Sequence, residues 1–511
     1  MNIARALAMK PRLVILDEAV SALDKSVEAQ VLQLLQELKR TLELTYVFIS
    51  HDLHVVRWAV GSDPRHVSWR KWWRLARRSS CLPASAHPYT RALLSSMPSM
   101  DPENRTLTSP LSGDPPSPSR RRAAAAFTPA AACEGGLRRS ETAAGSGRGE
   151  GHQSACLMAQ RPRPGIKASP LRRSAMSDNA FVHVRDLRVV FRRDGQTINA
   201  VNGVSFEVQK GEVMALIGES GSGKSVTLRA LMRLHPPGSS ELSGTLQVGD
   251  DEVLTMSASQ LRRYRGGRCA MIFQEPLLAF DPVYTVGQQI IEGLRRHEGL
   301  SRQAARDRAL EALRQVRIPS PERRLDAYPH EMSGGMRQRA MIALALSCNP
   351  QLLLADEPTT ALDATVQIQI LILLREQQKQ RGLSIVFVTH DIGAAVEIAD
   401  RVAVMYAGRI VEEASMSEIL RHPRHPYTQV LLGSRPKEGL KKGDALHCIP
   451  GAPPDLARLP PGCAFAERCP HRRPVCEQSL PPTESVAERH AVSCTAGASW
   501  RLTLTPRPWP V

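Results

Sequence analysis

Residues 213–225, VMALIGESGSGKS, have the residue types and spacing of a phosphate-binding loop. Gly218, Gly223, Lys224 and Ser225 satisfy the pattern G-x-x-x-x-G-K-[ST]. The glycines allow backbone N–H groups to wrap nucleotide phosphates, and the N-terminus of the following helix adds its dipole. Lys224 would then supply positive charge to the phosphates, and the Ser225 hydroxyl would ligate Mg²⁺. An apolar strand before the turn and a helix after it favour this interpretation over a chance Gly/Ser-rich turn.

A pair of carboxylates forms the second candidate site. LLLADE at 352–357 predicts a buried strand that ends in Asp356 and Glu357. Asp356 is suited to coordinate Mg²⁺, directly or through water, and Glu357 to polarise the attacking water as a general base. An acidic pair after a strand is usually only a solvated strand end. Its position after a phosphate loop in the same domain favours nucleotide hydrolysis.

Further motifs follow in a fixed order, and with them the chain resembles the ATP-binding subunits of ABC transporters. MIFQE at 271–275 resembles the glutamine loop, MSGGMRQR at 332–339 the signature, and ALD at 361–363 the dimer-contact loop. The resemblance implies that Gln274 touches Mg²⁺ and senses the membrane partner. It also implies that His390 is the switch histidine that holds the γ-phosphate, rather than a satisfied core histidine.

The resemblance further implies that ATP is sandwiched between two domains, because the signature helix of one binds the γ-phosphate held by the other. Phe191 is the expected stacking platform for adenine. The expected catalytic residues are Glu357, His390 and Gln274, and the expected Mg²⁺ ligands are Ser225, Gln274 and Asp356. The expected nucleotide contacts are Phe191, Gly218, Ser220, Gly221, Ser222, Gly223, Lys224, Ser225, Ser333, Gly334, Gly335 and Asp363.

The chain also carries an internal repeat. PRLVILDEAVSALD from residue 11 aligns with PQLLLADEPTTALD from residue 350, at an offset of 339 residues. Met1 aligns with Ala340, so the first copy has no phosphate loop, glutamine loop or signature. It would neither bind ATP by itself nor complete the other copy's site, and its two strands and one helix are too few to bury a core. It retains Asp17, Glu18, Asp24 and His51.

Similarity between the copies is lost in two windows, at about 58–86 and 117–151, although the spacing is kept. Compensated reading-frame slips produce this pattern, and divergent loops are the alternative. We therefore expect a tandem arrangement of two ATPases with a truncated, frame-disrupted first copy.

The C-terminal part narrows the resemblance to the oligopeptide/dipeptide importer family. HPRHPYTQVLL at 422–432 and the tail from Gly451 onward resemble the C-terminal extension of those ATPases. Four thiolates suit an iron–sulfur cluster or Zn²⁺, and some members of the family carry a [4Fe–4S] cluster here. Free buried thiols are the third alternative. The four cysteines are Cys463, Cys469, Cys476 and Cys494.

Composition excludes several other classes of protein. With 42% hydrophobic and 23% charged residues, the 511-residue chain is globular, and it has no apolar run that predicts a transmembrane helix or signal peptide. Ten cysteines are too few for a disulfide scaffold. The net charge of +17 is typical of nucleic-acid binders, but Arg57–Ala175 alone holds 20 Lys and Arg against 7 Asp and Glu. No nucleic-acid partner is therefore expected.

We expect an α/β chain whose P-loop ABC-type nucleotide-binding domain has a helical subdomain and a small Cys-containing extension. The expected function is ATP hydrolysis that energises import of peptides at the cytoplasmic face of the bacterial inner membrane. The expected partners are transmembrane permease subunits, a second ATPase domain from a homodimer or sister subunit and, indirectly, an extracytoplasmic substrate-binding protein. The expected domains are a truncated ATPase fragment (1–56), a degraded and disordered extension and linker (57–175), the complete nucleotide-binding domain (176–435) and the extension (436–511).

Two other classes remain open. One is a soluble ABC ATPase outside transport, and the other is an inactive product of a disrupted gene pair. Within transport, oligopeptides, dipeptides, glutathione and nickel chelates are not distinguished by the sequence, because selectivity resides in the membrane and binding subunits.

Overall fold

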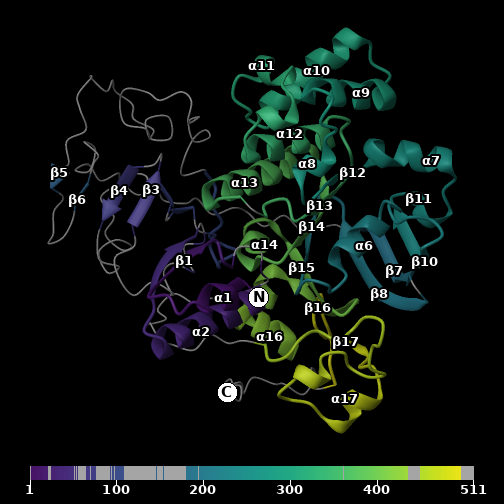
Figure 1. The fold of residues 1–511 in the computed structure, drawn as a ribbon. Helices are drawn as coiled ribbons and strands as arrows, with labels where there is room; N and C mark the ends of the chain where they lie inside the picture. The colour runs from purple at the N-terminus through teal and green to yellow at the C-terminus, as the bar shows by residue number, and fades with distance from the viewer. Residues whose placement is uncertain are drawn as a thin grey trace.

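The structure is a computed structural model in which most of the complete copy and its tail are described (Figure 1). The described residues are 2–50 without 21, 22 and 24; 52; 55; 65–68; 71–75; 92–93; 95–96; 98–108; 145–146; 153–154; 180–434 without 194 and 361; and 449–495. Asp24 and His51 therefore lie outside the described residues, as does most of 57–175.

An eight-stranded sheet forms the centre of the molecule, in the order β12-β13-β14-β9-β15-β16-β18-β17. The first five strands run parallel, and β16, β18 and β17 continue antiparallel. Strands β9, β13 and β14 are buried at every residue, as continuous apolar runs covered on both faces must be. The strands are β9 Val213–Ile217, β12 Cys269–Ile272, β13 Leu352–Asp356, β14 Ser384–Thr389, β15 Arg401–Tyr406, β16 Arg409–Ser415, β17 Thr483–Ala487 and β18 His490–Ser493.

Alternate residues of the parallel strands enter two separate cores. Leu353 and Phe387 pack with the helices α12, α13 and α14, whereas Leu352 and Val386 pack with α6 and an antiparallel sheet. This division follows from the two-residue period of a strand. The antiparallel sheet, ordered β11-β10-β7-β8, contains β7 Ala180–Arg193, β8 Gln196–Gln209, β10 Ser240–Val248 and β11 Asp251–Glu252.

The helices divide into a set against the sheet and a helical part, which is seen above the sheet in Figure 1. In the helical part, α9 begins at a capping box of Thr285 with Gln288 and ends at Gly299 in the left-handed conformation. The helices are α6 Lys224–Ala230, α7 Ala258–Arg263, α8 Pro276–Ala279, α9 Val286–Glu298, α10 Arg302–Gln315, α11 Pro321–Leu325, α12 Gly334–Leu346, α13 Ala364–Arg381, α14 Ile392–Ile398, α15 Met416–Arg421, α16 Pro426–Gly433 and α17 Pro474–Gln478.

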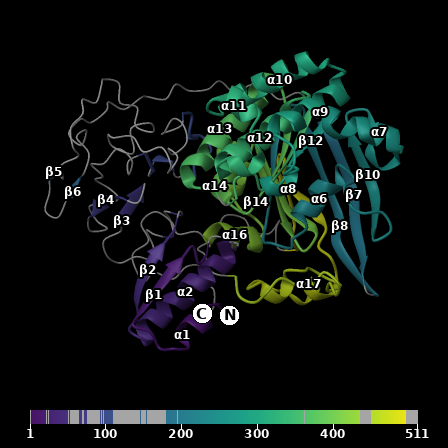
Figure 2. The same cartoon turned by 45° about the horizontal axis from the view of Figure 1, so that its top comes forward.

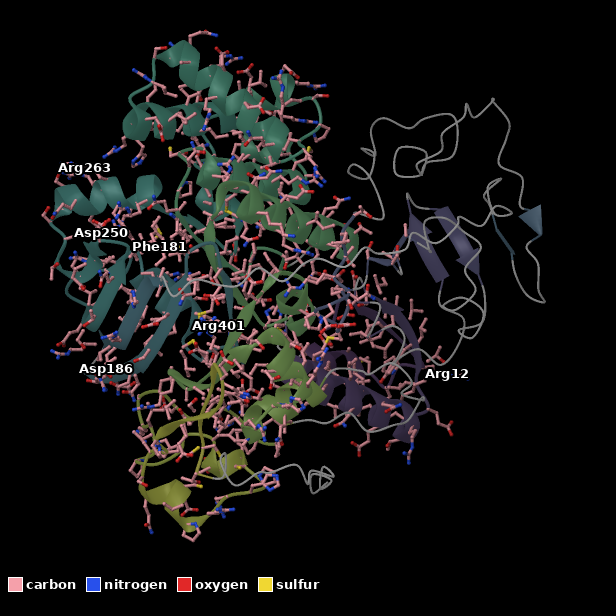
Figure 3. All side chains as sticks on the ribbon, turned by 180° about the vertical axis from the view of Figure 1, so that it is seen from behind. Arg12, Phe181, Asp186, Asp250, Arg263 and Arg401 are labelled. Atoms are coloured by element: carbon pink, nitrogen blue, oxygen red, sulfur yellow. The ribbon has the colours of Figure 1, made fainter. Side chains whose placement is uncertain are left out.

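A partly buried arginine links β15 to β16 and to the residue that precedes β9. Arg401, at the start of β15, lies 3.2 Å from Glu212 and also pairs with Glu413 of β16. Figure 3 labels Arg401 near the middle of the molecule and Arg12 on the N-terminal unit. The side chain of Glu212 is fully buried, so the pair keeps its charge compensated inside the fold.

The N-terminal unit has the same order of elements as the part of the complete copy that contains β13, α13 and β14. It consists of α1 Asn2–Leu7, β1 Leu13–Asp17, α2 Lys25–Thr41 and β2 Thr45–Ile49. Leu13 pairs with Thr45 in the same parallel register in which Leu352 pairs with Ser384, at the offset of 339. Glu18, like Glu357, has a φ of 47° and donates its N–H to the end of the neighbouring strand. The repeat in the sequence is therefore a repeat of backbone geometry.

One face of this N-terminal sheet is exposed. Leu13 and Ile15 are 52% and 63% exposed, whereas their counterparts Leu352 and Leu354 are fully buried. In the complete copy α6 and the antiparallel sheet cover that face, and the described part of the first copy contains neither element. The buried side chains of the unit form two small clusters.

Contacts hold the N-terminal copy to the complete one. Both ribbon views place α2 beside α16, and Gln30 of α2 donates to the carbonyl of Ile449 at 2.6 Å (Figures 1 and 2). Residues 98–108, from the extension of the first copy, continue this contact across α14. The described residues of the range 57–175 otherwise include four short strands, β3 Arg65–Ser68, β4 Lys71–Leu75, β5 Gly145–Ser146 and β6 Gln153–Ser154.

Glu397 is the centre of the contact with residues 98–108. Its side chain is fully buried, and its carboxylate accepts the backbone N–H groups of Ser99 and Thr106 at 3.0 and 2.8 Å. The Thr106 hydroxyl donates to it as well, at 3.0 Å, and Arg375 lies 3.8 Å away. A buried carboxylate needs such donors, so the segment stabilises the charge that it covers.

We predict that Glu397→Ala releases residues 98–108 from α14, because two amides and a hydroxyl lose their acceptor. Hydrogen exchange at the amides of Ser99 and Thr106 should accelerate by about tenfold or more. Glu103→Gln is the control, since it alters only the exposed ion pair of Glu103 with Arg421. Unprotected Ser99 and Thr106 amides in the parent protein would contradict the contact.

Candidate functional site

The phosphate loop connects β9 to α6 and depends on glycine at two close approaches. A Cβ at Gly218 would lie 2.2 Å from the carbonyl oxygen of Met405, and one at Gly223 would lie 2.5 Å from that of Ala200. Both residues also have positive φ, 154° and 98°. Only glycine fits these positions without moving the backbone.

Lys224 and Ser225 lie at the start of α6 and connect the loop to its surroundings. The buried Lys224 ammonium donates to the carbonyls of Gly218 and Glu219, each at 2.8 Å. The Ser225 hydroxyl donates to Oδ1 of Asp356 at 2.7 Å. The structure thus joins the phosphate loop to the acidic end of β13, two motifs whose bonded residues are 131 positions apart in the sequence.

Asp356 has the features expected of a Mg²⁺ ligand. It is 1% exposed, and its Oδ2 has no hydrogen-bond partner, although Arg229 lies 3.8 Å away. Burial raises the pKa of Asp356, against the lowering effect of the Ser225 hydrogen bond. A cation beside Ser225 would satisfy the unpaired oxygen and favour the ionised carboxylate. These two residues therefore fit the ion.

Glu357 is held by side chains from three other places in the sequence. His390 Nδ1 lies 3.2 Å from Oε1, and Gln274 Nε2 and the Thr360 hydroxyl donate to Oε2 at 3.2 and 2.9 Å. Burial alone would raise the pKa of Glu357, but the bonds from His390 and Thr360 and the charge of Lys224 keep it below its ordinary value. Glu357 is therefore a carboxylate at neutral pH that can accept a proton.

Parallel strand topology explains why these residues meet. Gln274, Glu357 and His390 follow the carboxyl ends of β12, β13 and β14, and the phosphate loop follows β9. The four strands are neighbours and run in the same direction, so their carboxyl ends lie along one edge. Ligands of open α/β sheets bind outside this edge. The sequence did not identify Thr360, whose signal was only its place between Glu357 and the ALD motif.

Comparisons with known proteins agree with this arrangement. Residues 201–360 match the family model described as ABC transporter. Residues 75–130 and 411–476 match the model of the oligopeptide/dipeptide transporter C-terminal region. A putative peptide import ATP-binding protein of Brucella ovis is 48% identical over 330 residues, which cover 62% of this chain and 98% of that protein.

The chain belongs to the ATP-binding proteins of the ABC transporter family. The dipeptide transport ATP-binding protein DppD and the oligopeptide transport ATP-binding protein OppD of Bacillus subtilis are each 47% identical to it, over 61% and 63% of this chain and 93% and 89% of theirs. Among solved structures, the dimeric ABC transporter cassette MJ0796 gives a TM-score of 0.42 at 27% identity, over 46% of this chain and 98% of that one. The model of the oligopeptide/dipeptide transporter C-terminal region thus matches a segment after each of the two copies.

The ABC signature forms an exposed helix start. Ser333 caps α12 by accepting the Met336 N–H at 3.2 Å, and Ser333 and Gly334 are exposed. Figure 2 shows α12 in the helical part of the ABC domain, with α6 and its phosphate loop beside the antiparallel sheet. Asp363 caps α13 and is exposed as well. These residues are thus accessible to a second domain.

Ser220, Gly221 and Ser222 lie within the loop. Gly221 has a φ of 77°, and a Cβ there would have no other atom within 4 Å, so its backbone conformation alone favours glycine.

Phe191 lies on β7 with its ring edge-to-face against His235 at 5.4 Å. Its role as the adenine platform stays a prediction. Gly335 lies in the first turn of α12.

The four cysteines of the extension are neighbours in the fold. Cys463 donates its backbone N–H to the carbonyl of Cys476 at 2.7 Å. Burial raises the pKa of Cys469 to about 12, and the other three thiols add to this shift. Thiolates suit soft metals. In the described part of the chain, however, no three Cys, His, Asp or Glu side chains are arranged to hold a metal ion, so this structure does not support a cluster or zinc site.

Proposed function

We propose that the complete copy hydrolyses ATP and thereby energises the import of peptides through an ABC transporter. One observation carries the proposal: the carboxylate of Glu357 contacts both Gln274 and His390 at the sheet edge where Lys224, Ser225 and Asp356 also meet. The peptide-import relatives, which the chain matches over almost their whole length, support the transport role.

The proposed reaction follows from the positions of these side chains. Backbone N–H groups of the loop and the Lys224 ammonium bind the phosphates of ATP. Ser225 and Asp356 would hold Mg²⁺, and the ion would supply positive charge to the phosphates. Glu357 accepts a proton from the attacking water, and His390 orients that carboxylate and contacts the γ-phosphate. Gln274 contacts the same carboxylate, and the chain continues from Gln274 into α8.

A second ATPase domain is part of the proposal. The exposed start of α12 lies on the same domain as the loop but is presented outward, so it can complete the site of another domain. The described N-terminal unit has neither a phosphate loop nor a signature. We therefore infer that two complete copies from two chains, or one chain and a sister subunit, form the active pair.

Exposed apolar side chains support a permease partner. They cluster in sequence directly around Gln274 and α8, and Leu278 and Val283 are 81% and 69% exposed. Apolar side chains gathered at a surface are typical of a protein interface. None of the helices described in the structure is both long and apolar enough to cross a membrane, so the proposal places the chain at the cytoplasmic face through that partner. The other exposed members are Phe273, Leu277 and Tyr284.

An iron–sulfur cluster remains a prediction from the sequence of the extension. The donor set of four thiols supports it, whereas their arrangement does not. No step of the proposed reaction involves it.

We predict that Glu357→Gln keeps ATP binding and lowers turnover by about a hundredfold or more, because an amide cannot accept the proton. Lys224→Ala should instead weaken binding itself, since it removes the charge that meets the phosphates. Nucleotide titration and phosphate release, measured on the same preparations, separate the two effects. Turnover in Glu357→Gln equal to that of the parent would exclude Glu357 as the base.

Mixing two inactive variants tests the proposed pair. Lys224→Ala removes the charge with which the loop binds phosphate, and Ser333→Arg blocks the signature at the start of α12. Each variant alone should therefore be inactive. A mixture should regain about a quarter of the parent rate, because half of the random pairs contain one intact composite site. A mixture as inactive as its components would contradict an active pair formed by two copies of this chain.

The permease surface is tested by Leu278→Asp, which puts a charge into the exposed apolar group. Peptide uptake by cells that co-express the permease subunits should fall strongly, because the interface would have to bury the charge. Leu480→Asp is the matched control, an exposed leucine of the extension that is 44% exposed. Equal loss of uptake in both variants would contradict a docking site at α8.

A further inference from the structure

The C-terminal extension reaches directly into the phosphate loop. Arg468 of the extension pairs with Glu219, the residue after Gly218, through Nη1 to Oε2 at 2.8 Å and Nη2 to Oε1 at 3.2 Å. The two side chains are only 5% and 4% exposed. A bidentate arginine–carboxylate pair of this kind fixes both distance and orientation.

Every donor nitrogen of Arg468 has a partner. Its Nε donates to the carbonyl of Pro450 at 2.9 Å, and Nη1 donates to the Tyr406 hydroxyl at 3.1 Å in addition to Glu219. The ring of Phe465 packs edge-to-face on Tyr406 at 5.3 Å. The position of the guanidinium is therefore fixed by partners in addition to Glu219.

The backbone of the loop is held from the same side. The Glu219 N–H donates to the hydroxyl of Tyr427 at 2.8 Å, and the ring of Tyr427 packs against Tyr406 at 4.7 Å. The carbonyl of Glu219 accepts the Lys224 ammonium at 2.8 Å. Side chain, N–H and carbonyl of Glu219 thus each have a separate partner, and all three contacts restrain the stretch that precedes the phosphate-binding N–H groups.

We propose that Arg468 is a positioning residue for nucleotide binding: it acts through Glu219 to hold the phosphate loop in the conformation that receives ATP. This inference rests on the proposed ATPase function and gives the extension a part in it. The extension is also joined to the complete domain through β18, which pairs with β16, through His490, which contacts Glu412 at 2.8 Å, and through Leu456, whose carbonyl accepts the Asn199 N–H at 3.1 Å. Of these contacts, the one made by Arg468 involves the side chain of a loop residue.

The test uses the full chain and compares four changes. Arg468→Met leaves the Glu219 carboxylate buried without its cation, and Glu219→Gln with Arg468→Met removes both charges. Arg468→Lys keeps the charge but loses the fork geometry. Arg472→Met is the control, because the ion pair of Arg472 with Glu477 lies on the surface of the same extension.

Arg468→Met should weaken ATP binding and raise the KM for ATP by about tenfold, with kcat at saturation within about twofold of the parent. The double variant should bind ATP about as weakly as Arg468→Met and not more weakly, because Arg468 acts through Glu219 and the paired contact is absent from both variants. Arg472→Met should bind as the parent does. If Arg468→Met is not recovered as folded protein, the double variant and Arg468→Lys provide the same comparison.

Unchanged affinity in Arg468→Met, or a fall in kcat without a change in KM, would overturn the proposal. A double variant that regains the parent affinity would overturn it as well, since the paired contact would then not be needed to position the loop. Binding is read without turnover, so this outcome is separate from the fate of Glu357. A parent protein that binds no ATP would instead reject the proposed function itself.

Discussion

Parallel pairing of four neighbouring strands is the constraint on which this ABC domain depends. β12, β13, β14 and β9 each end at the same edge of the sheet, and each is followed within two residues by a polar side chain or by the phosphate loop. The short bond from Ser225 to Asp356 and the contacts around Glu357 exist only because the register of these strands aligns their ends. Two apolar cores, one on each face, hold the strands in that register. A shift of one strand by a single residue would exchange its two faces and separate these groups.

The sequence predicted the parts of this site that leave a local signal. An apolar run before a polar pair marks β13 with Asp356 and Glu357, and glycine spacing marks the loop, because both signals lie within a few residues. Thr360, Glu219 and Arg468 left no such signal. Glu219 occupies a position that the loop motif leaves open, and its partner lies 249 residues further along the chain. Contacts over such separations depend on the packing of a complete domain, and no periodicity or spacing in one sequence records them.

The N-terminal unit also shows what local sequence determines and what it does not. Its strands keep the register of the complete copy, and Glu18 keeps the left-handed backbone of Glu357, so local sequence is sufficient to form this geometry. What local sequence does not supply is cover for the second face, and Ile15 and Val47 are accordingly exposed. The unit therefore has the backbone of an ATPase layer without the elements that bind nucleotide.

The two extensions nevertheless contact the complete domain at related positions. Residues 98–108 of the first copy cover Glu397 near the end of α14, the helix that begins directly after His390. Arg468 of the second copy contacts Glu219 at the start of the phosphate loop. Each contact neutralises or covers a buried carboxylate, and each carboxylate lies within seven residues of a residue of the proposed nucleotide site, Glu397 after His390 and Glu219 after Gly218. Because a buried carboxylate is costly when its donors are removed, both extensions are coupled energetically to the elements they touch.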